Sequence, residues 1–107
     1  EIYTLSLHDA LPICVSKDAL IYQIKPETEL LLEDAQASIG LSHHGMTFVG
    51  IWSPYPAKAP FVCLEPWAGI ADSSETSGQW PEKYQVIEVG PSNVSTHDYT
   101  LTFTKKN

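Results

Sequence analysis

Basic residues are scarce in this chain: its 107 residues include 6 Lys and Arg but 13 Asp and Glu, which gives a formal net charge of −7. Because no basic patch offsets the acidic balance, we expect no nucleic-acid partner and no anionic membrane partner, and a neutral or cationic ligand is easier to accommodate. The sequence also lacks any apolar run near the roughly 20 residues of a membrane span, and its N-terminus lacks the basic start and long apolar stretch of a signal peptide. These absences predict a cytoplasmic protein.

Cysteine is rare as well. Cys14 and Cys63 are the only two, and their spacing fits neither a metal site nor a redox pair, so we expect reduced, buried thiols. His43 and His44 are adjacent, and adjacent residues of a strand point to opposite faces, so the two imidazoles do not chelate one ion together. The sequence therefore predicts no metal site.

The first 13 residues, EIYTLSLHDALPI, differ in character from the rest of the chain. They resemble the translation of a sequencing-adapter read-through fused in frame to a gene fragment, and a fusion segment of this kind does not contribute to the native fold. We therefore expect residues 1–13 to be a non-native segment and residues 14–107 to be the folded domain. Removing Glu1 and Asp9 from the count takes the formal charge from −7 to −5, so the domain remains acidic.

The rest of the chain is rich in short β-type runs. A chain of this length has room for one domain of modest size, and turn residues separate the runs at spacings that suit antiparallel strands. The predicted strands are Asp18–Lys25, Thr28–Glu33, Ala37–Ser42, Met46–Ser53, Phe61–Glu65, Lys83–Val89 and Asp98–Thr104. The last is the clearest, because Tyr99, Leu101 and Phe103 alternate with three threonines. Since no helix is convincing, the sequence predicts an all-β fold, an antiparallel β-sandwich.

The run that ends at Glu65 raises the question of function. Alternation places Phe61, Cys63 and Glu65 on one face of a strand, where a lone carboxylate is costly to desolvate unless something pairs with it. Pro66 donates no ladder hydrogen bond, so we expect the strand to stop at Glu65 and to present the carboxylate at the rim of the sheet. Such a position suits a reactive group, and an acid that only ends a strand in solvent is an equally good interpretation.

Two loops lie next to Glu65 in the sequence: Pro54–Pro60, stiffened by three prolines, and the polar Asp72–Glu82. Binding and catalytic groups concentrate on such loops over a rigid sheet. Glu65 and Asp72 are a candidate carboxylate pair of the kind that glycosidases use, one as acid and one as base or nucleophile.

Tryptophans flank the same region. The apolar face of an indole suits the C–H face of a sugar, and Trp67 and Trp80, each beside a proline in a predicted loop, are the better candidates for that contact. Trp52 lies inside a predicted strand, so we expect it to pack in the core.

Residues 48–72, FVGIWSPYPAKAPFVCLEPWAGIAD, resemble a segment of the aldose 1-epimerase (galactose mutarotase) family. The shared pattern is GIW, then APFVC, then EPW followed by a glycine and AD. Asp18–Tyr22, DALIY, is similar to a strand start of the same family, and Glu82-Lys83 begins a stretch similar to its tail. The resemblance covers about residues 14–107 and departs from the family pattern at Gly90-Pro91-Ser92.

The resemblance implies that the chain is the C-terminal part of a galactose mutarotase-like β-supersandwich. Members of the family interconvert the α and β anomers of a free aldose such as galactose or glucose, with no metal or organic cofactor. The glutamate that takes the proton from the anomeric hydroxyl corresponds to Glu65, and Trp67, Asp18 and Asp72 are the substrate-binding candidates.

The family's acid histidine, which protonates the ring oxygen, has no counterpart in this chain. We therefore expect a fragment that is inactive alone, whose parent is an isomerase. Two alternatives stay open: a non-catalytic carbohydrate-binding β-sandwich, and a glycosidase fragment that uses Glu65 and Asp72.

Overall fold

The computed structural model describes residues 4–7, 11–15, 19–52 and 61–107. Within them the chain forms eight β-strands and one three-residue 3-10 helix, Trp80–Glu82. The strands are β1 (Thr4–Leu7), β2 (Leu11–Val15), β3 (Ala19–Gln23), β4 (Leu30–Glu33), β5 (Ala37–His44), β6 (Phe48–Trp52), β7 (Cys63–Trp67) and β8 (Asp98–Lys105).

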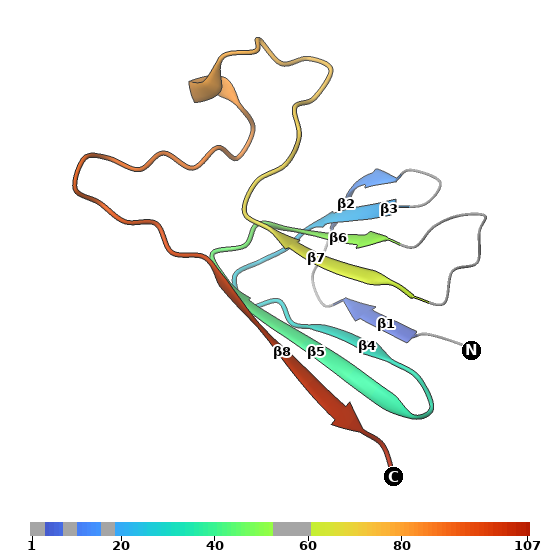
Figure 1. Cartoon of the computed structure of the whole chain (residues 1–107). Coiled ribbons are helices and arrows are strands. Elements are labelled where there is room, and N and C mark those ends of the chain that lie inside the picture. The colour runs from blue at the N-terminus through green and yellow to red at the C-terminus, as the bar shows by residue number, and fades with distance from the viewer. Residues whose placement is uncertain (1–3, 8–10, 16–18, 53–60) are drawn as a thin grey trace.

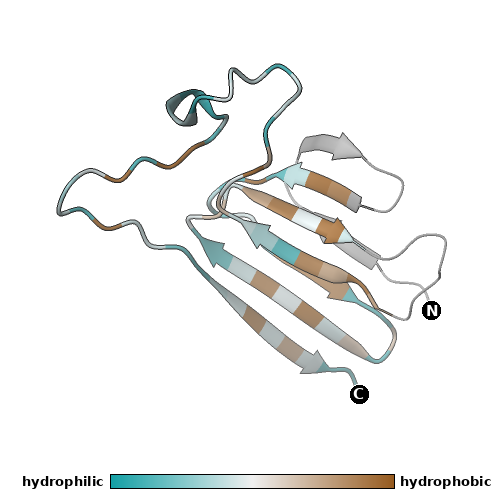
Figure 2. Cartoon of the chain, turned by 45° about the horizontal axis from the view of Figure 1, so that its top comes forward, coloured by the Kyte–Doolittle hydropathy of each residue, from teal (hydrophilic) through white to brown (hydrophobic). Residues whose placement is uncertain are grey.

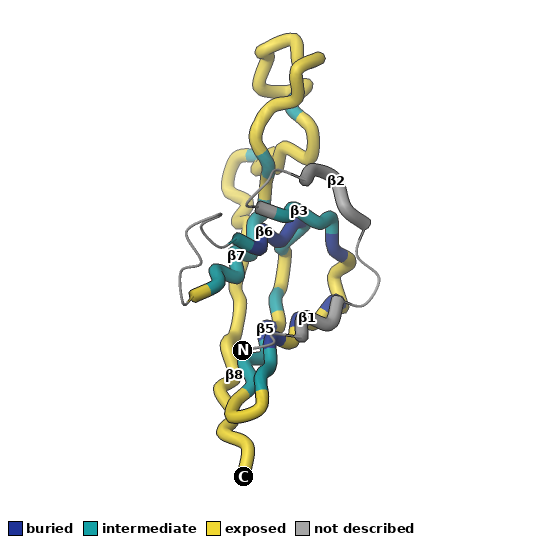
Figure 3. The backbone as a smooth tube through the Cα atoms, turned by 90° about the vertical axis from the view of Figure 1, so that its right-hand side faces the viewer, coloured by how far each residue is buried: buried dark blue, intermediate teal, exposed yellow. Residues whose placement is uncertain are grey.

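The strands form two four-stranded antiparallel sheets (Figure 1). Sheet A has the order β1-β4-β5-β8, and sheet B has the order β2-β3-β6-β7. The two sheets lie as layers with the buried residues gathered on the strands that face one another (Figure 3). The predicted all-β, antiparallel sandwich is therefore confirmed.

The core lies between the two sheets. Successive side chains of a strand point to opposite faces, so residues two apart share the inner face of their sheet. Leu30 and Leu41 are paired across sheet A, and they meet Val49 and Ile51 of sheet B together with Ile24 in one buried cluster. Burying a side chain of this size contributes roughly 1.5–3 kcal/mol, so this cluster stabilises the contact between the two sheets.

Two predicted strands are confirmed and prove longer than expected. β5 runs on to His44 and β8 runs on to Lys105. The two strands pair along their whole length, from Ala37 with Lys105 to His44 with Asp98. The end residues of each strand are therefore kept extended by hydrogen bonds to the other strand.

The predicted strand Lys83–Val89 is wrong. These residues lie in the long β7–β8 segment (residues 68–97), where a turn from Lys83 to Val86 is closed by a 3.2 Å backbone hydrogen bond. Gln85 within that turn has φ = 54°, which an extended strand does not allow. The alternation of apolar residues is present, but no neighbouring strand among the described residues supplies a hydrogen-bonding edge, so propensity alone does not make a strand.

The β7–β8 segment projects from the sandwich (Figure 1). The radius of gyration of the chain is 15.9 Å, whereas a compact domain of this length has about 13 Å. The difference reflects a segment that packs little of its own surface against the sheets.

A short hydrogen-bonded chain ties the end of this segment to the turn between β5 and β6. The Nδ1 of His97 lies 2.9 Å from the Gly45 carbonyl oxygen, and its Nε2 lies 2.7 Å from the Ser95 hydroxyl. Because a carbonyl oxygen only accepts, Nδ1 carries the proton, and in the neutral ring Nε2 accepts from Ser95. Gly45 has φ = 76°, and a Cβ there would lie 2.8 Å from both His97 Nδ1 and the Thr96 carbonyl oxygen. Only glycine fits this turn.

The predicted turn at Asp34 is confirmed. Its Oδ1 accepts hydrogen bonds from the backbone N–H groups of Gln36 at 2.7 Å and Ala37 at 2.8 Å. These two bonds favour the charged carboxylate and lower the pKa of Asp34 below its ordinary value. The turn thereby starts β5 in the register that β4 requires.

Part of the segment expected to be non-native lies in strands. The backbone of β1 pairs with β4, and that of β2 pairs with β3, each at an edge of its sheet. Whether residues 1–13 are needed for the fold stays a prediction, and deletion tests it. In the part of the chain described above, no helix has the length and apolar character needed to cross a membrane.

Candidate functional site

Glu65 lies on the outer face of sheet B, the face turned away from the core. Strand pairing sets three rows across this face, and the middle row joins Glu65 of β7 to Gly50 of β6 and Ile21 of β3. The carboxylate is half-buried, and among the described residues it has no ion-pair or hydrogen-bond partner. A paired strand therefore holds the acid in place on this face.

The strand does not stop at Glu65, which corrects the expectation drawn from Pro66. β7 begins at Cys63 and continues to Trp67, with Pro66 paired opposite Val49. β7 is an edge strand of sheet B, and proline is tolerated at an edge because its missing N–H can face outward. Glu65 is therefore placed inside the last strand of a sheet rather than at the strand's end.

Trp67 shares this face with the acid, two residues along the same strand. Its indole bends back over Gly50, the residue opposite Glu65: a Cβ at Gly50 would lie 2.8 Å from Cζ2 and 3.1 Å from Cη2 of the ring. The missing side chain at Gly50 is thus what lets the half-buried indole lie over Gly50, the residue paired with Glu65.

The β7–β8 segment covers the third row of the outer face. The Tyr84 ring lies 6.1 Å from the ring of Phe48, the partner of Trp67 in the sheet, and its hydroxyl donates to Gln23 Oε1 at 3.2 Å. Phe48 is fully buried as a result, although it faces away from the core. The segment is therefore docked against the same face that carries Glu65.

The expectation that Trp52 packs in the core is corrected by the structure. Trp52 lies half-buried on the outer face opposite Cys63, and its ring is 5.9 Å from that of Phe61. Period-2 alternation from Gly50 assigns Trp52 to the face of Glu65. The acid is accordingly flanked by two tryptophans, one on each neighbouring row.

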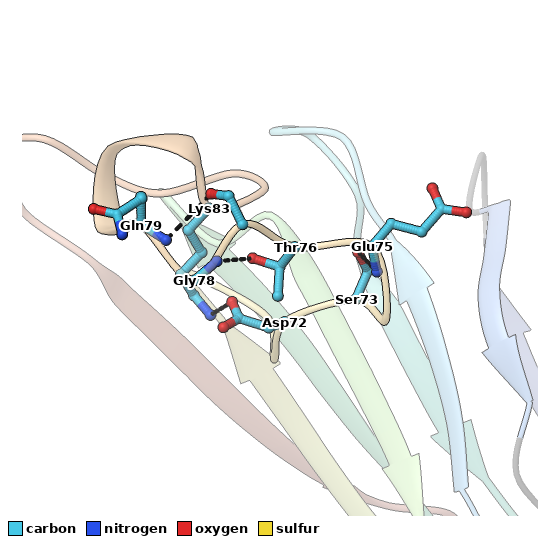
Figure 4. Close-up of polar contacts among 8 residues, drawn as sticks. Asp72, Ser73, Glu75, Thr76, Gly78, Gln79 and Lys83 are labelled. Atoms are coloured by element: carbon cyan, nitrogen blue, oxygen red, sulfur yellow. Dashed lines mark hydrogen bonds and ion pairs between the residues drawn. The ribbon is translucent and has the colours of Figure 1, made fainter.

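Asp72 lies in the loop after β7 and turns toward Lys83 (Figure 4). The Asp72 Oδ1 is 2.7 Å from the Lys83 Nζ, and both residues line a hollow of about 180 Å³ with Gly78, Gln79 and Trp80. The indole of Trp80 is 76% exposed. Asp72 is thus engaged by an ion pair within its own loop, and Glu65 does not line that hollow.

Side-chain hydrogen bonds fix the backbone of this loop (Figure 4). The hydroxyls of Ser73, Thr76 and Ser77 each accept a bond from the N–H two residues on, at 3.2–3.3 Å. Such turns order an exposed loop without burial, so Trp80 is presented from an ordered backbone.

The remaining predicted residues are placed elsewhere or not described. Asp18 lies outside the described residues. His43 pairs with Tyr99 on the inner side of sheet A, and His44 is on the outer side of sheet A, opposite Asp98. Neither histidine shares a face with Glu65, and both ring nitrogens of His43 are buried without a hydrogen-bond partner among the described residues.

The chemistry available on this face is that of a base beside an apolar platform. A carboxylate can accept a proton, and an indole offers an apolar surface to a ligand. Across the described ranges, no group of three or more His, Cys, Asp and Glu side chains is arranged to hold a metal ion.

Two curated relatives are similar to the chain: Protein LacX, plasmid, and Protein LacX, chromosomal, both of Lactococcus lactis subsp. lactis. Each is 38% identical to it over 52 residues, which is 49% of this chain and 17% of the relative. The aligned stretch therefore spans less than a fifth of these relatives. No family model matches the chain. No solved structure matches it either.

Proposed function

We propose that the chain is the C-terminal part of a cytoplasmic aldose 1-epimerase, with Glu65 as the base that takes the proton from the anomeric hydroxyl of a free aldohexose. The observation that carries the proposal is the outer face of sheet B, where a half-buried carboxylate without a partner among the described residues lies beside the Trp67 indole. The similarity of residues 48–72 to the aldose 1-epimerase family supports the same assignment.

In this reaction Glu65 accepts the anomeric proton while an acid protonates the ring oxygen, so the C1–O5 bond breaks and the open aldehyde forms. Rotation about C1–C2 and reclosure, with both protons returned, give the other anomer. No atoms are gained or lost, and general acid and base groups suffice. No described histidine lies on the face of Glu65, so the acid comes from a part of the parent outside this chain, and the chain alone is inactive.

Substrate binding is assigned to the tryptophan flanks and to polar groups nearby. Trp67 offers its exposed surface to the C–H face of the pyranose. Asp72, together with its partner Lys83, presents a carboxylate and an ammonium group to sugar hydroxyls from the adjoining loop. Asp18 is proposed as a third binding residue because Asp18–Tyr22 resemble a strand start of the family.

The deciding experiment is Glu65→Gln in the complete parent enzyme, because the amide keeps the shape of the side chain and loses its basicity. We expect turnover to fall roughly 10²–10⁴-fold, the usual effect of removing a general base. Polarimetry of freshly dissolved α-D-galactose or α-D-glucose against a buffer blank measures the rate.

Glu88→Gln is the matched control, since Glu88 is an exposed acid of the β7–β8 segment and its replacement should leave the rate unchanged. If Glu65→Gln retains activity within a few-fold of the wild type, Glu65 is not the base and the assignment fails.

A second candidate, a non-catalytic carbohydrate-binding function, is favoured by one observation: the exposed Trp80 over a hollow lined by Asp72, Gln79 and Lys83. In that case the 107-residue chain alone binds galactose or glucose with a change in tryptophan fluorescence that Trp80→Ala abolishes. The parent would then bind sugar without speeding anomer exchange, and this outcome separates the two functions.

A further inference from the structure

Strand β8 is a long edge strand that the rest of the described chain leaves open. It ends the order of sheet A, and all eight of its residues are exposed. Tyr99, Leu101 and Phe103 point to the inner side of sheet A, since they pair with His43, Leu41 and Ile39, and they are 54%, 41% and 71% exposed. Figure 3 shows β8 exposed along its whole length, and Figure 2 shows the alternating apolar bands on it and on β5.

Natural proteins protect such edges, and the middle of β8 lacks the usual protection. A proline, a bulge or an inward-pointing charge normally prevents another strand from adding to an open edge. β8 contains no proline, and its eight consecutive pairs with β5 show no break in register. Its charged residues lie at the two ends: Asp98 is on the outer side at one end, and Lys105 is on the inner side at the other end, opposite Ala37. The middle of the strand therefore stays apolar on its inner face. The edge is therefore suited to pairing with a further strand.

We propose that β8 pairs with β8 of a second copy of this chain, antiparallel across a two-fold axis at Thr102, so that sheet A continues into the sheet of the partner subunit. A two-fold axis perpendicular to the sheet keeps the inner faces of both copies of sheet A on the same side. Residues opposite each other then point to the same side, so the axis lies between the two copies of one residue and not between two successive residues. The Thr102 register places Leu101 opposite Phe103 of the partner subunit, and Phe103 opposite Leu101 of the partner subunit. Phe103, the most exposed apolar side chain of the strand, is thereby covered.

Charge favours this register over its neighbours. Centred on Thr102, the pairing places Asp98 opposite Lys106 of the partner subunit at each end. The Lys106 Nζ already donates to Glu33 Oε2 and to the Asp34 carbonyl oxygen, both at 2.8 Å, and an ammonium group has a third donor left.

The neighbouring registers lose these contacts. Centred on Leu101, the pairing sets Asp98 against Thr104 of the partner subunit, and centred on Phe103 it sets Leu101 against Lys105 of the partner subunit. The net charge of −7 opposes association elsewhere, but residues 98–106 carry two lysines and one aspartate, so this edge is not acidic.

Light scattering and sedimentation of the whole chain over a concentration series test the pairing. We expect a reversible dimer, whose dissociation constant rises at least tenfold in Leu101→Lys and in Phe103→Lys, because each variant sets an inward-pointing charge against an apolar side chain of the partner subunit and removes one half of the Leu101–Phe103 pair. Val94→Lys is the matched control, since Val94 is 87% exposed but lies outside β8, and it should dimerise as the wild type does. Far-UV circular dichroism verifies that each variant is folded.

Cross-linking tests the register independently. In a background of Cys14→Ser and Cys63→Ser, Thr102→Cys places the new thiol opposite its own copy, within the Cα separation that a disulfide spans. Thr100→Cys does not, because residue 100 faces residue 104. We expect a disulfide-linked dimer from Thr102→Cys in mild oxidant and much less from Thr100→Cys.

Three outcomes would overturn the proposal. The chain is a monomer at every concentration, in which case the apolar edge belongs to strands of a longer parent. It dimerises equally well in Leu101→Lys and Phe103→Lys, so another surface is used. Or Thr100→Cys cross-links as readily as Thr102→Cys, so the register is different. None of these results bears on Glu65, which is on the other sheet.

Discussion

Strands β6 and β8 are both rich in apolar residues, yet their surroundings are opposite. In β6 the inner residues Val49 and Ile51 are buried against sheet A, and the outer residue Phe48 is buried beside Tyr84. β8 has a regular apolar alternation and is exposed on both faces. Alternation thus decides which residues share a face, and what lies opposite decides whether that face is buried.

The comparison also separates two uses of a sheet face. Sheet B has one row of its outer face covered by Tyr84, and the row that carries Glu65 stays half-buried beside it. Sheet A has an inner face that continues past sheet B onto β8 without a cover in the described chain (Figure 3). A rigid, partly covered face suits a site, whereas an open edge suits association.

The largest effect is expected from paired phenylalanine truncations. Phe48 is 0% exposed and Phe103 is 71% exposed, so Phe48→Ala should lower the free energy of unfolding by about 3–5 kcal/mol and Phe103→Ala by about 0.5 kcal/mol or less. Urea unfolding, followed by tryptophan fluorescence at a low protein concentration that keeps the chain monomeric, measures both. Equal losses would mean that β8 is covered in solution as well as β6.

A glycine pair sharpens the comparison at smaller magnitude. Gly50→Ala brings a Cβ to 2.8 Å from the Trp67 ring, whereas at Gly40 in sheet A the nearest atom is the Thr102 Cβ at 3.9 Å. We expect Gly50→Ala to destabilise by about 1–3 kcal/mol and Gly40→Ala to be neutral or stabilising by up to about 1 kcal/mol. A shifted tryptophan emission should accompany Gly50→Ala alone. An unchanged stability for Gly50→Ala would show that the indole does not lie over this glycine.

The smallest effect is expected from deleting residues 1–13, which removes β1 from sheet A and most of β2 from sheet B. If the segment is foreign to the fold, the thermal midpoint of residues 14–107 stays within about two degrees of the full chain, as measured by circular dichroism. A loss of several degrees, on the scale of about 1 kcal/mol for a domain of this size, would make both edge strands integral to the fold.

Much of the sandwich could be predicted because its signal is local. The alternation in residues 98–104 and the turns at Asp34 and Pro26 depend on neighbours in sequence, and the structure bears them out. The strand expected at Lys83–Val89 failed because a strand also needs a partner, and which segments meet is a tertiary outcome.

The site was partly predictable for the same reason. The alternation correctly placed Glu65 with Cys63 on one face. The expected stop at Pro66 failed, because whether a strand tolerates proline depends on its being at an edge, which the sequence of one strand does not state. The indole over Gly50 was missed because the contact joins two strands, although a glycine in an apolar run is the signal for close approach.

The hydrogen bonds between His97 and the Gly45 turn also bear on chain entropy. β5 and β8 are joined through a connection that includes β6, β7 and the whole projecting segment, and the cost of closing such a loop grows only as the logarithm of its length, about 0.6 kcal/mol for each doubling. Once His97 is attached to the Gly45 carbonyl oxygen, however, Asp98 is the next residue and His44 lies directly beside it. The attachment turns a pairing between distant parts of the chain into a local one, so the length of the projecting segment can change with little effect on how well sheet A is completed.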